Sequence, residues 1–167
     1  MDIPPFPCPV CGSPFNGRII VHERSVRGET GIQACSACGL HITWPRLPDP
    51  QGEYHKEDRT LWERKYGAIA QGARLHDRHA NYLEEVALLR RLVPGGRVLD
   101  VGCNAGWLLG YLQRAGGFTP EGLEPGVMLA DIARERLGVP VHNTTLQALQ
   151  NHDGAFDALI ATDVIEH

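Results

Sequence analysis

The chain has 167 residues, with 16 Lys and Arg side chains against 20 Asp and Glu, which gives a formal net charge of −4 at pH 7. This charge provides no general attraction to nucleic acid or to an anionic membrane surface, and no run approaches the ~18 apolar residues that span a bilayer. Hydrophobic residues make up 43% of the sequence, as is ordinary for a folded globular protein. The start MDIPPFPCPVCG carries no secretory signal, so we expect a soluble, cytoplasmic protein.

Three stretches of different character follow one another along the chain. Residues 1–50 are rich in Pro, Gly and Cys and contain two β-prone segments, Arg18–His22 and Leu40–Trp44. Residues 51–95 are charged and have helical patterning, whereas residues 96–167 alternate short apolar runs with helical patterns. We therefore predict a small cysteine-rich module, a helical connecting or lid segment and an α/β domain, in that order.

Four of the five cysteines stand in two copies of the pattern C-x-x-C-G, at residues 8–12 and 35–39. A two-residue gap lets both sulfurs of a pair face one ion, and the glycine supplies the tight turn that follows. We predict a zinc ribbon whose closed thiolate site is structural, with His22 and His41 as less favoured alternative ligands. The predicted zinc ligands are Cys8, Cys11, Cys35 and Cys38.

Strands and helices are predicted to alternate in the last part of the chain. Helical periodicity runs from Tyr82 to Val93, and the Pro-Gly-Gly sequence at residues 94–96 breaks it. The strands predicted after this break are 97–101, 120–124, 139–142 and the start of 156–165, and the helices are 106–115, 127–137 and 146–151. Helices of this length between strands imply βαβ units and a parallel sheet.

The turn after the first of these strands has the composition of a nucleotide-binding loop. Gly102 and Gly106 let the backbone pass close to a ligand, and Asn104 tolerates a left-handed conformation. Nicotinamide and flavin folds use such a turn too, so the glycines alone leave the cofactor open. Asp100, expected at a buried strand end, suits a cationic ligand better than a pyrophosphate. Glu124, after the next strand, can accept hydrogen bonds from both hydroxyls of a ribose.

These motifs resemble those of class I S-adenosylmethionine-dependent methyltransferases. The family's first motif is D-x-G-x-G-x-G, which residues 100–106 match with Asn104 at the middle glycine. The run FDALIATDVIEH, residues 156–167, is similar to the family's fourth-strand motif in the branch that ends D-V-x-E-H. The ribbon followed by CGLHITWPR resembles zinc-ribbon-bearing bacterial members of this branch. The resemblance implies a Rossmann-like parallel sheet with S-adenosylmethionine as its cofactor.

The resemblance also implies how residues surround that cofactor. The loop after the first strand would shape the site for the methionine part, and the carboxylate after the second strand would hold the ribose. The following Pro125 and the loop after the third strand would flank adenine, and the end of the fourth strand would lie near the methyl-bearing sulfur. Cys103 is expected to pack within its loop rather than act as a nucleophile. The implied cofactor-binding residues are Asp100, Gly102, Cys103, Asn104, Gly106, Glu124, Pro125, Thr145, Leu146, Thr162 and Asp163.

Two candidate catalytic residues, Glu166 and His167, follow the fourth strand, where an open parallel sheet binds ligands. His167 is a candidate base because an unperturbed histidine has a pKa of roughly 6.5, although a capping or packing role accounts for it equally well. Tyr54, Tyr66 and His76 could cover the pocket or belong to an ordinary amphipathic segment, and so could His79. The acceptor is expected to be a small molecule of open identity.

The sequence supplies four strands where the family's sheet has seven. We therefore expect an N-terminal portion of a methyltransferase, with the cofactor half-site present and much of the acceptor site absent. One alternative is a non-catalytic interaction module that joins a zinc ribbon to an S-adenosylmethionine-binding half-sheet. An RNA methyltransferase guided by the ribbon is less favoured, because residues 1–50 carry no net charge.

Overall fold

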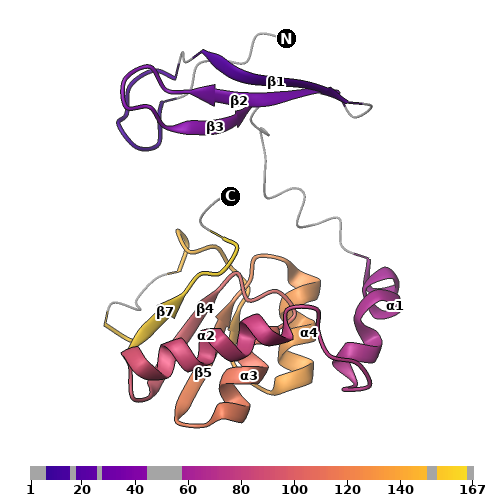
Figure 1. Ribbon diagram of the computed structural model, residues 1–167. Coiled ribbons are helices and arrows are strands. Elements are labelled where there is room, and N and C mark those ends of the chain that lie inside the picture. Colours follow the sequence, from indigo (N-terminus) through magenta and orange to yellow (C-terminus); the bar gives the residue numbers. More distant parts are fainter. Residues whose placement is uncertain (1–6, 16–17, 26–27, 45–57, 150–153, 165–167) are drawn as a thin grey trace. The chain divides into compact units, whose positions relative to one another are not determined.

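The computed structural model describes residues 7–15, 18–25, 28–44, 58–149 and 154–164 (Figure 1). The chain divides into two compact units, Met1–Pro50 and Gln51–His167, which we call the N-terminal unit and the C-terminal unit. The further division of residues 51–167 into a connecting segment and an α/β domain stays a prediction. Within the described residues, no helix is long and apolar enough to cross a membrane.

The N-terminal unit is a three-stranded antiparallel sheet in the order β1-β2-β3, with two cysteine-bearing turns (Figure 1). Strand β1 is Ile19–Ser25, β2 is Gly28–Ala34 and β3 is His41–Trp44. The β-prone segments predicted at 18–22 and 40–44 correspond to β1 and β3. The only buried hydrophobic side chains described in this unit are Cys8, Phe15 and Cys35. So small an apolar core supplies little stability, since hydrophobic stabilisation grows with the area removed from water.

The C-terminal unit contains a four-stranded parallel sheet in the order β6-β5-β4-β7. Strand β4 is Gly96–Val101, β5 is Phe118–Leu123, β6 is Val141–His142 and β7 is Ala158–Ile160. Helix α1 is Arg59–Ala70, α2 is His79–Leu92, α3 is Trp107–Ala115 and α4 is Val127–Leu137. Strand β4, the first of these four in sequence, therefore lies inside the sheet, with later strands added on both of its sides. This arrangement confirms the predicted Rossmann-like parallel sheet.

Helices α2, α3 and α4 lie in front of the sheet in Figure 1, and their apolar residues share one core with it. Val98 of β4 is fully buried in that core, together with Val86 of α2, Leu112 of α3 and Ile132 of α4. Successive residues of a strand point to opposite faces, so the neighbouring Leu99 belongs to a second core on the other face. The partly buried side chains that pack against this second core come from loops.

Two helical segments differ from expectation. Helix α1 was not predicted as a separate element; Asp58 begins it, accepting hydrogen bonds from the backbone N–H groups of Thr60 and Leu61 at 2.9 and 3.1 Å. The short helix predicted at 146–151 is wrong over its described residues 146–149, which form a turn. Leu146 in this turn is 52% exposed, and of the two leucines only Leu149 packs against a core, so little apolar burial is available to stabilise a helix.

Gly122 on β5 gives a direct test of how tightly the sheet packs on the loop after β4. A Cβ atom added there would lie 2.5 Å from Sγ of Cys103 and 2.9 Å from Cδ1 of Leu109. Gly122→Ala should therefore lower the free energy of unfolding by about 1–3 kcal/mol, as overpacking of a core does. Urea denaturation measures the change.

The matched control for this substitution is Gly67→Ala in helix α1, where an added Cβ meets nothing within 4 Å. Alanine stabilises an exposed helix interior by about 1 kcal/mol relative to glycine, so this variant should gain stability. Equal stability of the two variants would contradict the packing described here.

Candidate functional site

A pocket of about 520 Å³ lies in the C-terminal unit at the carboxyl end of strand β4. Open parallel sheets bind ligands at this end of their strands, at the point where the strand order reverses. Strand β4 is that point here, since β5 pairs with one of its sides and β7 with the other. Six of the predicted cofactor-binding residues line the pocket: Asp100, Gly102, Cys103, Asn104, Thr162 and Asp163.

The loop after β4 has the backbone conformation that its sequence predicts. Gly102, Asn104 and Gly106 all have positive φ, at 71°, 53° and 76°. Asn104 therefore stands in for the family's middle glycine with a left-handed backbone, which asparagine adopts more readily than most residues. The backbone N–H groups of Gly102 and Cys103 both donate to the carbonyl of Leu123, at 2.7 and 3.0 Å, and so fix the loop against β5.

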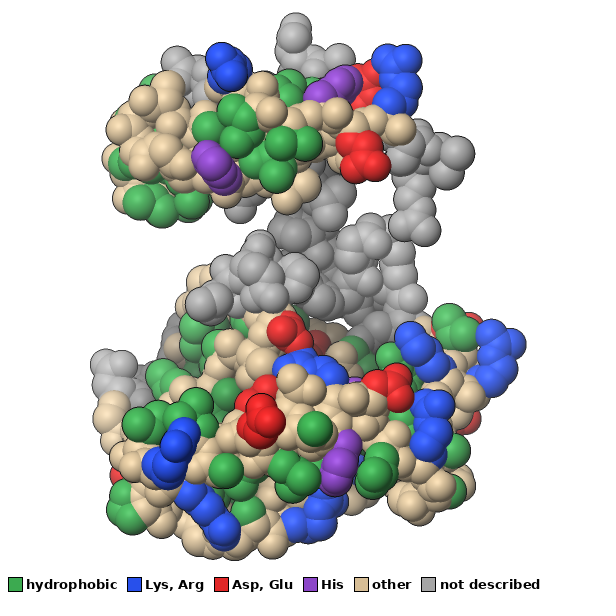
Figure 2. All heavy atoms as spheres, viewed as in Figure 1, with side chains coloured by type: hydrophobic (Ala, Val, Ile, Leu, Met, Phe, Trp, Pro, Cys, Tyr) green, Lys and Arg blue, Asp and Glu red, His purple; other side chains and the backbone are tan. Residues whose placement is uncertain are grey.

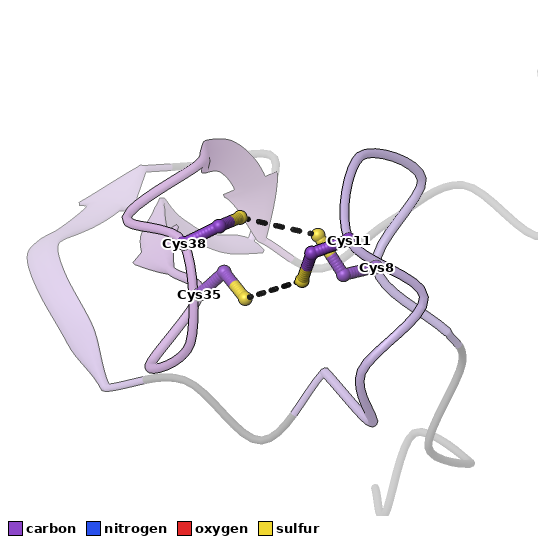
Figure 3. Close-up of side chains that lie close together, drawn as sticks. All are labelled: Cys8, Cys11, Cys35 and Cys38. Atoms are coloured by element: carbon purple, nitrogen blue, oxygen red, sulfur yellow. Dashed lines mark hydrogen bonds between the residues drawn. The ribbon is translucent and has the colours of Figure 1, made fainter.

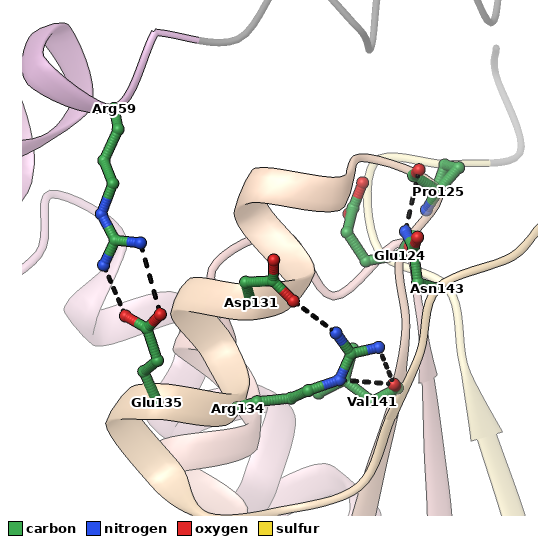
Figure 4. Close-up of polar contacts among 8 residues, drawn as sticks. All are labelled: Arg59, Glu124, Pro125, Asp131, Arg134, Glu135, Val141 and Asn143. Atoms are coloured by element: carbon green, nitrogen blue, oxygen red, sulfur yellow. Dashed lines mark hydrogen bonds and ion pairs between the residues drawn. The ribbon is translucent and has the colours of Figure 1, made fainter.

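Glu124 holds two loops together. Its side chain is 4% exposed; Oε2 accepts the backbone N–H of Asn104 and Oε1 accepts that of Gly126, both at 2.8 Å. The Nδ2 of Asn143 donates to the carbonyls of Glu124 and Pro125 at 2.9 and 3.0 Å, so the loop after β6 joins them (Figure 4). That this carboxylate also accepts hydrogen bonds from a ribose stays a prediction.

The remaining predicted cofactor residues do not line the pocket. Gly106 begins helix α3, and a Cβ added there would lie 2.8 Å from Cδ1 of Leu137 and 3.0 Å from Cβ of Ala133. It is thus required for close packing of α3 on α4. The carbonyl of Thr145 accepts the backbone N–H groups that close the following turn. The pocket's lining leaves out Gly106, Glu124, Pro125, Thr145 and Leu146.

Asp100 is the most perturbed carboxyl group of the pocket. It is 4% exposed, and burial raises its pKa to about 8, helped by the negative charges of Glu85 and Glu124 and opposed by the positive charge of Arg78. At neutral pH much of this carboxyl group is therefore protonated. A ligand cation placed beside it would restore the charged form, because an opposite charge favours ionisation. The ionisation of Asp100 therefore depends on whether a cation is bound beside it.

Arg78 is a pocket residue that sequence reasoning did not find. It lies directly before helix α2 and forms ion pairs with Glu85, at 3.1 Å, and with Asp163. Burial raises the pKa of Glu85, against the effect of Arg78. The guanidinium thus lies at the pocket wall, paired with two carboxylates. Arg78 is far in sequence from the glycine-rich loop, so no sequence motif indicated that it lies in this pocket.

Aromatic rings from α1 and α3 form a second part of the pocket that was not predicted as a unit. Trp62 stacks on Trp107 with ring centroids 6.0 Å apart, and Tyr66 stacks on His76 at 6.3 Å. Burial lowers the pKa of His76 and so favours its neutral ring. Helix α1 is tied to α4 by the ion pair of Arg59 with Glu135 (Figure 4). Tyr66 and His76 had been possible covering residues; both line the pocket.

The sequence singled out five further residues, which differ in where they lie. Tyr54, Glu166 and His167 lie outside the described residues. His79 contacts the hydroxyl of Tyr111 through Nδ1 and is not part of this pocket. Cys103 is 4% exposed and burial raises the pKa of its thiol, which agrees with the predicted packing role and disfavours a nucleophilic thiolate.

The four predicted zinc ligands come together in the N-terminal unit, and all four sulfurs lie within 4.8 Å of one another (Figure 3). The Sγ atoms of Cys8 and Cys38 are 3.7 Å apart, and those of Cys11 and Cys35 are 3.8 Å apart. A tetrahedron with Zn–S bonds of about 2.3 Å has edges of about 3.8 Å, so this set fits a zinc ion. No pair forms a disulfide.

The two cysteine turns have the same backbone hydrogen bonds. Gly12 N–H donates to the carbonyl of Cys8 and Gly39 N–H to that of Cys35, both at 2.9 Å. Both glycines have positive φ, 72° and 77°, which confirms the predicted tight turns. Hydrogen bonds from the backbone and side chain of Ser13 lower the pKa of Cys11 to about 6, and backbone N–H groups of Cys38 and Ala37 lower that of Cys35. Such donors favour the thiolate form that binds metal.

Comparison with known proteins matches residues 74–167 to the family described as "Methyltransferase domain". The chain belongs to this family. A ubiquinone biosynthesis O-methyltransferase of Methylocella silvestris is 34% identical over 82 residues, which are 46% of this chain and 32% of that protein. The chain thus spans about a third of the length of this curated relative.

Solved structures of methyltransferases are similar to part of this chain. Magnesium protoporphyrin IX methyltransferase from Synechocystis with bound SAM has a TM-score of 0.50 and 19% identity, over 74% of this chain and 66% of that chain. An amino pentose methyltransferase from Micromonospora echinaspora has a TM-score of 0.48 and 27% identity, over 65% of this chain and 44% of that chain. The first of these similarities supports the class I methyltransferase fold.

Proposed function

We propose that the chain binds S-adenosylmethionine at the pocket beside Asp100 and belongs to a methyltransferase that acts on a small-molecule acceptor. The observation that carries this proposal is the buried carboxyl group at the end of β4, whose charged form a cationic ligand would stabilise. S-adenosylmethionine carries a sulfonium and an ammonium but no phosphate, so it suits this charge pattern better than a dinucleotide does. Membership of the methyltransferase family supports the same assignment.

The charged groups of the cofactor's methionine part have matching groups in the described pocket. Asp100 would accept hydrogen bonds from the ammonium, and Arg78 would pair with the carboxylate of the methionine part. Thr162 and Asp163, after β7, would lie near the methyl-bearing sulfur. The loops held by Glu124 would receive the adenosine part.

Methyl transfer from a sulfonium is an in-line displacement by an acceptor atom, so the protein chiefly positions the acceptor. The aromatic side chains of α1 and α3 would exclude water from the reacting groups. Glu166 and His167 remain the proposed acceptors of a proton from an oxygen or nitrogen nucleophile. We also propose a cytoplasmic location and a structural zinc ion in the N-terminal unit.

Calorimetric titration of the full chain with S-adenosylmethionine and with NAD tests the cofactor assignment. We expect saturable binding of S-adenosylmethionine and no heat of binding from NAD. A methylation assay with a pool of small acceptors then tests turnover, with the chain and with a longer form that includes further strands. Binding of NAD alone would overturn the proposal, and binding without turnover by either form would favour the non-catalytic module.

Arg78 gives a finer test of how the cofactor lies. Arg78→Gln should weaken S-adenosylmethionine binding by about tenfold, because it removes a charge-assisted hydrogen bond to the ligand carboxylate. Methylthioadenosine lacks the amino-acid part, so its affinity should not change. Arg64→Gln on the exposed side of α1 is the matched control. An equal loss for both ligands would assign Arg78 a purely structural role.

A further inference from the structure

The C-terminal unit has a second pocket, of about 920 Å³, whose chemistry is unlike that of the first. Helix α2 and helix α3 form its walls, and the end of α1 with the following loop completes it. Apolar side chains form much of the lining, including Ile69, Leu83 and Val86. Leu83 is 51% exposed and Leu75, in the loop, is 65% exposed, so the pocket presents apolar surface to solvent.

Arginines surround this apolar surface. The lining residues that the structure describes include five arginines and no aspartate or glutamate. Figure 2 shows blue Lys and Arg side chains along the lower margin of the C-terminal unit, with green hydrophobic side chains between them. In a chain whose net charge is −4, so many cations beside apolar surface form a distinct local environment. The arginines are Arg74, Arg90, Arg91, Arg114 and Arg136.

The charge of these arginines is not neutralised by the described carboxylates. None of the five takes part in an ion pair within the described residues; those pairs involve other arginines. Arg90 donates to the carbonyl of Ala115, and Arg114 lies over the ring of Tyr111, 4.6 Å from its centroid. Arg136 lies over the ring of Trp107 at 4.1 Å, and burial, followed by the positive charge of Arg114, lowers its pKa. Positive charge is therefore concentrated here.

We propose that this pocket binds a small amphipathic anion, with an apolar chain or ring on its floor and a phosphate or carboxylate head among the arginines. The volume lies within the range of small-molecule sites, roughly 300–1,000 Å³. Guanidinium groups hold phosphate and carboxylate oxygens with two parallel hydrogen bonds, and apolar floor residues favour a hydrocarbon body. The concave apolar lining favours such a molecule over nucleic acid, whose phosphate backbone binds to an extended polar surface.

The second pocket differs from the proposed cofactor pocket in the charged residues of its lining, although two residues line both pockets. His76 and Trp107 line both pockets. The first pocket has Asp58, Asp100 and Asp163 in its lining, whereas the second has no described acidic residue. Lys65 and Arg78 also line the first pocket, so it has charges of both signs, whereas the charged lining residues described in the second are all arginines. The second site does not depend on the proposed methyl transfer.

Calorimetric titration of the full chain with dodecyl phosphate, kept below its micelle-forming concentration, tests the proposal. We expect dodecyl phosphate to bind saturably. Dodecyl maltoside has the same alkyl chain but no charge, so its affinity should be lower by at least about tenfold. The double variant Arg91→Gln with Arg114→Gln should bind dodecyl phosphate with an affinity lower by about tenfold or more. The matched control combines Arg18→Gln with Arg64→Gln, two exposed arginines outside the pocket, and should bind as the unmodified chain does.

Four outcomes would overturn the proposal. One is equal binding of the charged and neutral detergents, and another is an equal loss in the control variant. Competition by S-adenosylmethionine would place the detergent in the first pocket instead. Sedimentation with vesicles of phosphatidylcholine and phosphatidic acid, or binding of a single-stranded RNA, without binding of monomeric dodecyl phosphate would assign the arginines to a macromolecular surface. The Leu83→Gln variant supplies a second readout. It should lower the affinity for dodecyl phosphate, whose alkyl chain contacts the apolar lining, but not the affinity for inorganic phosphate.

Discussion

Replacing Asp100 with asparagine should weaken S-adenosylmethionine binding by about tenfold to a hundredfold at pH 7.5, the value of one hydrogen bond between charged groups. The pKa of Asp100 is raised to about 8 in the protein without ligand, so binding of a cation must draw a proton from this carboxyl group. In the unmodified chain the affinity should therefore rise by up to about tenfold per pH unit between pH 6 and 7.5. The Asp100→Asn variant should lose this pH dependence.

Two controls separate this effect from a change in folding. Titrations in buffers of different ionisation enthalpy should reveal a proton released on binding by the unmodified chain and none by the variant. The raised pKa also means that Asp100 contributes stability below its unfolded pKa, ~4, and that this contribution is lost as the pH rises through about 8. Asp100→Asn should thus become more stable, relative to the unmodified chain, as the pH increases. An affinity equal to that of the unmodified chain at every pH would contradict the role given to Asp100.

Removal of zinc should unfold the N-terminal unit and leave the C-terminal unit folded. Few hydrophobic side chains are buried among the described residues of the N-terminal unit, whereas a structural zinc site supplies roughly 10–16 kcal/mol of apparent binding energy. A chelator, or Cys38→Ser, should therefore remove the amide signals of strands β1 to β3 from an NMR spectrum. The signals of strands β4 and β5 should persist. Metal analysis should find one zinc ion in the unmodified chain and a reduced content in the variant.

Cys103→Ser is the matched control for this experiment, since Cys103 is the one cysteine that lies outside the four-sulfur cluster. This variant should keep its zinc and the signals of β1 to β3. Full zinc content in Cys38→Ser, or an N-terminal unit that stays folded after the metal is stripped, would contradict the structural role.

The parallel sheet and the loop after β4 could be predicted because both depend on local sequence patterns. Short apolar runs separated by helical periodicity fix a parallel arrangement, and the D-x-G-x-N-x-G pattern fixes a left-handed turn at Asn104. The paired cysteines were predictable for the same reason: a two-residue spacing dictates the turn and the direction of both sulfurs.

Features that depend on tertiary packing could not be predicted in this way. Arg78 and Trp62 precede the sheet in sequence and reach the pocket only because α1 and α2 pack beside it. The packing of Gly106 against α4 could not be predicted, because a glycine that admits a ligand and one that admits a neighbouring helix have the same sequence signature. Its role in cofactor binding stays a prediction. The turn at 146–149 was predicted as a helix from composition alone, but Leu146 finds no apolar surface there.

The two hydrogen bonds of Glu124 have a consequence for how the cofactor would arrive. With one oxygen on Asn104 N–H and the other on Gly126 N–H, a single carboxylate orders both loops while the chain folds. The conformational entropy of these loops is then lost during folding rather than during binding, which is the meaning of a preorganised receptor. Amide hydrogens of Asn104 and Gly126 should therefore exchange slowly with solvent even before any ligand is added.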